Sequence, residues 1–200
     1  ITIGSDIGSG TATFSGGITL NGNVSATAAA GGITAFSGNI TGSGGIDKVG
    51  AGTVVLSGVN TYSGGTTING GTLSVAADEN LGDSSGGITL GGGTLELTSG
   101  FTLGSGRTVT AAASTTSRLA VTSGTVSYGG AFAGSGGLDK AGAGQLTLGN
   151  ASTGYTGSFT ISAGTVELTA VAVMLVASGR GVSVMPDWVL RRESANPELA

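Results

Sequence analysis

Cysteine and histidine are both absent from the 200 residues of this chain. Without cysteine, neither disulfides nor thiolate-bound metal sites can form. Without histidine, the commonest general base and metal ligand is missing, and a Ser-His-Asp triad cannot be assembled. The lack of cysteine suits an exported bacterial repeat protein.

Proline, aromatic residues and charge are also scarce. The chain has only two prolines and no Gly-X-Y period, which excludes collagen although glycine numbers 42. Charged residues make up 9%, and Val, Ile and Thr are abundant, whereas disordered chains are usually rich in charge. The net charge of −4 argues against nucleic acid as a partner, because phosphate binding needs clustered Lys and Arg. What remains is an all-β fold with many tight turns.

One long segment occurs twice. Residues 42–75 read GSGGIDKVGAGTVVLSGVNTYSGGTTINGGTLSV, and residues 134–168 read GSGGLDKAGAGQLTLGNASTGYTGSFTISAGTVEL. Asp47-Lys48 recurs 92 residues later as Asp139-Lys140, and one added residue makes the offset 93 from Tyr155 onward. Short β-type runs between glycine-rich corners, repeated at this length, predict a stacked solenoid.

We predict a right-handed parallel β-helix with a short non-repeat C-terminal tail. At about 20 residues per rung, residues 1–169 give roughly eight rungs, spaced ~4.8 Å apart. Inward Ile, Val, Leu and Phe would stack on their equivalents, while outward Thr and Ser and corner Asn form ladders between rungs. The clearest expected strands are 11–14, 18–20, 33–36, 52–57, 66–68, 72–75, 88–90, 94–97, 107–110, 118–121 and 125–127.

The composition changes at residue 170. Residues 170–200 hold only two glycines, yet both prolines, both methionines and the only tryptophan. The apolar run at 170–177 is eight residues long, too short to cross a bilayer. We therefore expect a unit distinct from residues 1–169, made of a short helix and a strand.

The charged residues suggest few sites. Adjacent residues of a strand point to opposite faces, so Asp47-Lys48 and Asp139-Lys140 do not converge on a substrate, and stacked copies alone would bring the two carboxylates together. We expect these dipeptides to be solvated charges beside rung corners. Asp78, Glu79 and Asp83 form an acidic cluster without the spacing of an EF-hand loop. Residues 44–47, GGID, lack the third glycine of calcium-binding β-rolls.

Other catalytic or binding patterns are equally weak. Residues 82–86 match G-x-S-x-G, which we interpret as a turn because no histidine can complete a triad. Eight acidic and four basic residues are spread over residues 1–169, too sparsely for the cleft of a polysaccharide lyase or hydrolase. Tyr62, Tyr155 and Trp188 could stack on sugars, but corner packing fits the tyrosines better. We predict no catalytic, cofactor or metal residues and no enzymatic activity.

The long repeat resembles a known family. Residues 42–73, with GGIDK, GAGTVVLSG, NTYSGGTTI and GGTL, are similar to the passenger-associated transport repeat of Gram-negative autotransporters, and residues 134–166 form a looser copy. The resemblance implies a β-helical passenger, located at the cell surface or secreted, that is exported through an outer-membrane barrel. It also implies two kinds of partner, the translocator barrel of the parent protein and host or matrix ligands. Because the sequence shows neither a signal peptide nor a barrel, we expect an internal fragment.

The tail resembles a different family. Residues 175–186, LVASGRGVSVMP, are similar to a helix-loop-strand segment in the effector-binding domain of LysR-type regulators. The segment includes no DNA-binding element, so no regulator function is inferred.

The sequence favours one function and leaves two alternatives open. The favoured function is a structural stalk that aids export and displays adhesive or other functions. The alternatives are a carbohydrate-active passenger, either a lyase or a hydrolase, and a misjoined gene fragment with no function as a unit.

Overall fold

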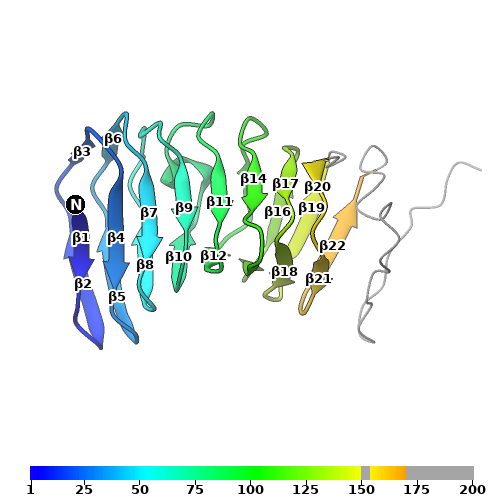
Figure 1. Cartoon of the computed structure of the whole chain (residues 1–200), viewed down its shortest axis with the longest axis horizontal. Coiled ribbons are helices and arrows are strands. Elements are labelled where there is room, and N and C mark those ends of the chain that lie inside the picture. The colour runs from blue at the N-terminus through cyan, green and yellow to red at the C-terminus, as the bar shows by residue number, and fades with distance from the viewer. Residues whose placement is uncertain (150–153, 170–200) are drawn as a thin grey trace, which may run out of the picture.

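The chain folds into a β-solenoid of about seven turns in the computed structural model, which describes residues 1–149 and 154–169 (Figure 1). Two parallel sheets contain eight strands each, and a four-stranded and a two-stranded sheet complete the coil. Each strand pairs in parallel with the strand one turn further along the chain. The predicted all-β parallel helix is thus confirmed, while its right hand stays a prediction. The expected boundary at residue 170 also stays a prediction, because the tail lies outside the described residues.

Strands occupy three faces in sequence order. The first face consists of β1 (Thr2–Ser5), β4 (Val24–Ala28), β7 (Ile46–Val49), β9 (Thr66–Ile68), β11 (Ile88–Leu90), β14 (Val109–Ala111), β17 (Phe132–Gly134) and β20 (Gly154–Tyr155). The second consists of β2 (Gly10–Phe14), β5 (Gly32–Phe36), β8 (Thr53–Leu56), β10 (Thr72–Val75), β12 (Thr94–Leu97), β15 (Thr116–Val121), β18 (Gly137–Ala141) and β21 (Phe159–Ile161).

The third face is less regular. Its strands are β3 (Ile18–Leu20) and β6 (Ile40–Gly42) in one sheet, and β13 (Thr102–Leu103), β16 (Thr125–Tyr128), β19 (Gln145–Leu148) and β22 (Thr165–Leu168) in another. Between β6 and β13 this face is formed by irregular segments, one of which contains the short 3-10 helix η1 (Asp78–Leu81). The irregular part separates the two third-face sheets.

Alternation of small outward and apolar inward residues builds the core. In β8, Val54 and Leu56 are buried while Thr53 faces outward. Val54 is in register with Leu73, so equivalent side chains stack from turn to turn. Each fully buried Val or Leu contributes about 1.5–3 kcal/mol. The core is therefore a column of inward rows, and the outward rows contribute little to it.

Asparagine side chains link the turns at one corner, as expected. The Asn60 side chain accepts a hydrogen bond from the Ile40 amide at 2.8 Å and donates to the Asn80 carbonyl at 2.6 Å. The Asn80 side chain in turn donates to the Gly58 carbonyl at 3.0 Å. Three successive turns are joined through two amide side chains, which confirms the predicted role of corner asparagines.

The two long repeats lie on different faces of the solenoid. The first repeat places β7 and β9 on the first face and β8 and β10 on the second. The second repeat places β18 and β21 on the second face and β19 and β22 on the third. The 92-residue offset thus equals four turns plus one face, because the row that starts at Asp47 reaches Ala133, and Asp139 follows on the next face. The copies do not stack, so their carboxylates do not meet.

Candidate functional site

Lys48 points into the solenoid, and its side chain is completely buried. It occupies an inward row in register with Ala26 and Ile68. Its Nζ donates to the carbonyls of Val49 at 2.8 Å and Gly50 at 2.9 Å, both in its own turn. A third bond, also 2.9 Å, reaches the Gly70 carbonyl in the following turn. The ammonium group thus uses all three of its N–H donors.

Lys140 repeats this arrangement on the next face of the solenoid. It is also fully buried, in an inward row between Leu119 and Ile161. Its Nζ lies within 2.9–3.1 Å of four carbonyls, three in its own turn and one in the following turn. The four acceptors are Ala141, Gly142, Gly144 and Ala163.

A glycine of the following turn makes room for each ammonium group. Gly71 has φ +58°, and a Cβ there would lie within 2.5 Å of the Gly50 and Gly52 carbonyl oxygens and 2.7 Å from the Lys48 Nζ. Gly164 has φ +73°, and a Cβ there would lie within 2.5 Å of the Gly142 and Gly144 carbonyl oxygens and 2.8 Å from the Lys140 Nζ. Both the backbone conformation and the close approach therefore require glycine at these positions.

Burial lowers the pKa of Lys48 to about 8. It also lowers the pKa of Lys140 to about 8, although the negative charge of Asp139 acts in the opposite direction. The carbonyls around each Nζ match the ammonium form and compensate part of the cost of burying it. The expectation that these lysines are solvated charges was wrong, because the corner carbonyls hold them inside.

The aspartates of the same dipeptides lie on the outer surface, as the alternation predicted. The Asp47 carboxylate accepts a hydrogen bond of 2.6 Å from the Asn69 side chain of the following turn. The Asp139 carboxylate accepts 2.9 Å from the Ser162 hydroxyl, again in the following turn. Each Asp-Lys dipeptide therefore fastens the following turn from both sides of the sheet, and we call this arrangement the two-sided clamp.

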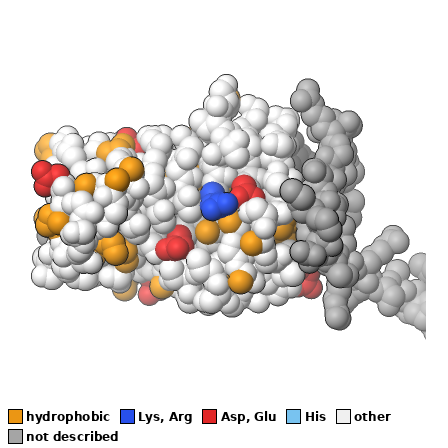
Figure 2. All heavy atoms as spheres, turned by 90° about the horizontal axis from the view of Figure 1, so that it is seen from below, with side chains coloured by type: hydrophobic (Ala, Val, Ile, Leu, Met, Phe, Trp, Pro, Cys, Tyr) orange, Lys and Arg blue, Asp and Glu red, His pale blue; other side chains and the backbone are white. Residues whose placement is uncertain are grey.

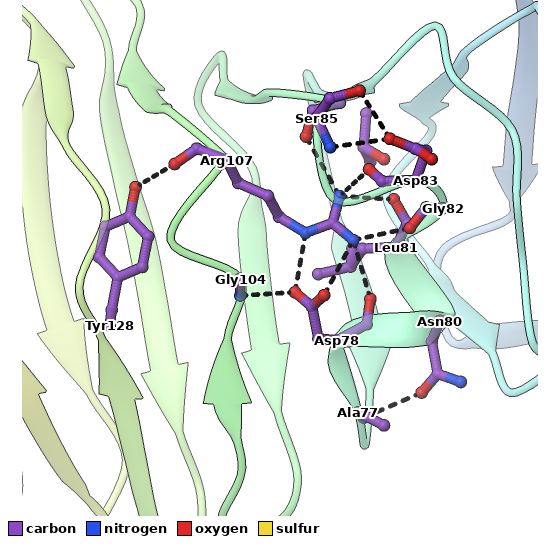
Figure 3. A network of polar contacts seen from close by, with 12 residues as sticks. Ala77, Asp78, Asn80, Leu81, Gly82, Asp83, Ser85, Gly104, Arg107 and Tyr128 are labelled. Carbon is purple, nitrogen blue, oxygen red and sulfur yellow. Dashed lines mark hydrogen bonds and ion pairs between the residues drawn. The ribbon is translucent and has the colours of Figure 1, made fainter.

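Arg107 organises the irregular segment around η1 (Figure 3). Its side chain is buried and forms an ion pair with Asp78, with 2.8 Å between Nε and Oδ1. The two terminal nitrogens donate to five carbonyls over 2.7–3.1 Å, those of Asp78, Leu81, Gly82, Asp83 and Gly86. We expected a strand from residue 107, but β14 begins at Val109 because Arg107 turns inward.

The acidic cluster and the G-x-S-x-G pattern both belong to this segment. Asp78 is bound by Arg107 and the Gly104 amide, while Asp83 accepts from the amide and hydroxyl of Ser85. These hydrogen bonds from Ser85 lower the pKa of Asp83. Within residues 1–149 and 154–169, no group of three acidic, histidine or cysteine residues is placed to hold a metal ion. The chemistry of this segment is that of a structured turn.

Tyrosine hydroxyls close corners rather than face solvent. The Tyr62 hydroxyl lies 2.7 Å from Thr66 Oγ1, and the Tyr155 hydroxyl donates to the Ser158 carbonyl at 2.6 Å. Tyr128, which the sequence did not single out, donates to the Arg107 carbonyl at 2.7 Å. Burial raises the pKa of all three tyrosines to about 12. The predicted corner role of the tyrosines is confirmed, and Trp188 lies outside the described residues.

Few charges remain on the surface. Among the described Lys and Arg residues, only Arg118 is exposed, with 55% of its side chain accessible, and it pairs with Asp139 at 3.2 Å. Figure 2 shows a face on which basic charge lies beside acidic charge and most other side chains are uncharged. The outward row through Arg118 is otherwise mostly threonine, in the order Thr11, Ile33, Thr53, Thr72, Thr94, Arg118, Asp139 and Thr160.

A small hollow at the N-terminal end of the core has a purely apolar lining. Its lining residues are Ile3, Ile18, Leu20, Val24, Ala26, Phe36, Ile40 and Ile46. No acid, base or metal ligand faces it, so it offers no catalytic chemistry. Among the described residues, no helix has the length and apolar character needed to span a membrane.

Comparison with known proteins gives one family match. The passenger-associated-transport-repeat matches twice, over residues 46–75 and 138–168. No curated protein and no solved structure matches the chain. The two matches coincide with the clamped pairs of turns, the first running from β7 through β10 and the second from β18 through β22.

Proposed function

We propose that this chain, whose two transport repeats within a β-solenoid support its place among autotransporter passengers, is a structural stalk segment. The family implies a cell-surface or secreted location and linkage to an outer-membrane translocator domain. The stalk would aid export and display adhesive or other functions carried elsewhere on the passenger. The observation that carries the proposal is the recurrence of the two-sided clamp in both repeats.

The mechanism is mechanical and kinetic. Every strand of a turn offers its backbone edge to the next turn, so folding propagates along the coil from an existing turn. The clamps add side-chain bonds that form only when the following turn has docked, through Gly70 in one repeat and Ala163 in the other. Folding outside the cell that proceeds turn by turn in this ordered way would oppose return of the chain through the barrel.

A structural role also accounts for the use of charge. Lys48, Lys140 and Arg107 are buried against carbonyls, so three of the four described cations serve the fold. An enzyme of this architecture would instead concentrate its charged groups on an accessible face.

A carbohydrate-active passenger is the second candidate. It is favoured by one observation: Glu96, Arg118 and Asp139 lie on three neighbouring strands of the second face, and Arg118 is exposed. If this face were catalytic, Glu96→Gln and Asp139→Asn would abolish turnover of polysaccharide by the passenger. Turnover that survives both substitutions would place the active site elsewhere in the parent protein, and no turnover by the parent protein would exclude this candidate. Either result leaves the stalk as the function of this chain.

One-turn deletions test the stalk. The full chain is placed between a signal peptide and an autotransporter barrel, and surface display is measured by external protease. Deleting residues 46–65 removes one clamped turn, since Ile46 is in register with Thr66. Deleting residues 109–131 removes one turn outside the repeats and keeps Arg107, since Val109 is in register with Phe132. We expect display to fall several-fold only in the first case, and equal display of the two deletions would contradict the proposal.

A further inference from the structure

We propose that Lys48 and Lys140 fix the register between successive turns of the solenoid, each locking one pair of turns. The problem they solve is slippage, because turns built of similar short strands can pair in more than one alignment. A shift by two residues keeps every inward side chain inward, so apolar packing alone discriminates weakly against it. The proposal goes beyond a stalk function, since a stalk could be built from apolar rows alone.

The inward rows show what makes the lysines different. The neighbours of Lys48 in its row are Ala26 and Ile68, and those of Lys140 are Leu119 and Ile161. An apolar residue at either lysine position would accept several alignments of the next turn. A buried ammonium accepts only an alignment that provides enough carbonyl oxygens, because an unpaired buried charge is strongly unfavourable.

The following turn provides the carbonyl oxygen that each ammonium group needs at one alignment. In that alignment Gly70 brings its carbonyl to 2.9 Å from the Lys48 Nζ, and Gly71 leaves the space that any Cβ would fill. A shift by two residues would carry both away from the ammonium group. Ala163 and Gly164 play the same parts for Lys140. A buried polar residue that specifies alignment at the expense of stability is a known device in coiled coils.

Paired cysteines can measure the register directly, because the chain has no cysteine of its own. Thr53 and Thr72 are in register on the turns that Lys48 joins, so T53C/T72C should form a disulfide. V55C/T72C is offset by two residues, about 7–8 Å apart, and should not form one in the native register. The same scheme in the second repeat uses Q145C/T165C as the aligned pair and T147C/T165C as the shifted pair.

The substitution tested is Lys48→Met, which keeps a long side chain and removes the charge. We expect the full chain to keep its unfolding midpoint or gain stability. Cross-linking of V55C/T72C should rise about 5–30-fold, which corresponds to a small loss in the free-energy difference between the native and the shifted register. Cross-linking of Q145C/T165C in the second repeat should not change. Lys140→Met should give the reciprocal result, and Ile68→Met, in the same inward row as Lys48, should leave both repeats in register.

Two results would overturn the proposal. If Lys48→Met keeps the aligned disulfide as exclusively as the unsubstituted chain does, the lysine does not set the register. If Lys48→Met instead loses the aligned disulfides of both repeats, the lysine supports global stability rather than local alignment.

Discussion

The solenoid closes its corners with buried cations in two different ways, and the comparison separates a repeated device from a local one. The lysine corners use carbonyls of two successive turns and no carboxylate partner inside, and they occur once in each transport repeat. The Arg107 corner uses an ion pair with Asp78 and five carbonyls of one irregular segment. The lysine corner joins successive turns in the same way in both repeats, whereas the arginine corner holds together one irregular segment, the one that contains η1.

The difference follows from the chemistry of the two side chains. A lysine ammonium is a compact charge with three donors, so a tight glycine corner can satisfy it. A guanidinium is planar with five donors and needs a wider shell, which η1 and the residues after it provide. A segment as long as this one interrupts the third face, which explains why the arginine corner does not recur in the described turns.

The largest expected effect comes from Arg107→Ala. It leaves the Asp78 carboxylate without its partner and five carbonyls without their donor, which costs about 3–5 kcal/mol of unfolding free energy. Urea denaturation measures the loss, and hydrogen exchange should show it first in residues 78–86. The control is Arg118→Ala, whose exposed ion pair contributes less than about 1 kcal/mol. Equal losses of unfolding free energy in the two variants would show that buried Arg107 contributes no more to stability than exposed Arg118.

A smaller loss is expected from Gly71→Ala. The left-handed backbone conformation and the contacts of the added Cβ with the Gly50 and Gly52 carbonyls and the Lys48 Nζ together should cost roughly 1–3 kcal/mol. Gly70→Ala is the matched control, because Gly70 has no positive φ and its added Cβ would meet nothing closer than 3.5 Å. The second repeat already has Ala163 at the equivalent position. If Lys48→Met does not relieve part of the Gly71→Ala loss in a double-mutant cycle, the contact with the ammonium group does not contribute to that loss.

The sequence predicted the fold well because the fold is periodic. Alternation around Val54 and the glycine-rich corners were enough to place β8 and its neighbours, and asparagine corners such as Asn60 followed from the same logic. The transport repeat was found from its motifs. Periodicity could not predict the face of the solenoid on which the second repeat begins. The turns between the two repeats vary in length, and their total length determines the face on which Asp139 lies.

The candidate site was harder to predict. The period of two correctly places Asp47 outside and thus Lys48 inside, yet the rarity of buried lysines predicts a solvated charge. The carbonyls that bind it come partly from residue 70, one turn away. Arg107 was missed for a similar reason. Its signal was the acidic Asp78-Glu79 pair about one turn earlier, which only a known turn length converts into a contact.

The lysine corners should also make stability depend on pH. The pKa of each buried lysine is about 8, below its ordinary value of 10.5, so between these values the unfolded chain binds more protons than the folded one. Stability should therefore rise as the pH increases from 8 towards 10, by roughly 2 kcal/mol for each lysine. Urea denaturation at both pH values measures the rise, and the doubly substituted Lys48→Met/Lys140→Met chain should lack it. A fall in stability would mean that the carbonyls outweigh desolvation.

The smallest effect concerns the tyrosines that close corners of both repeats. Tyr62→Phe removes the hydroxyl that lies 2.7 Å from Thr66 Oγ1 and leaves that buried threonine without this partner, which should cost about 1 kcal/mol. Tyr155→Phe should cost less, because its hydroxyl is bonded to carbonyls nearer the surface. Thermal unfolding of the two variants gives the comparison. The two repeats share one motif and differ in the face on which they lie. A larger loss of stability for Tyr155→Phe would show that the second repeat depends more on its tyrosine than the first does.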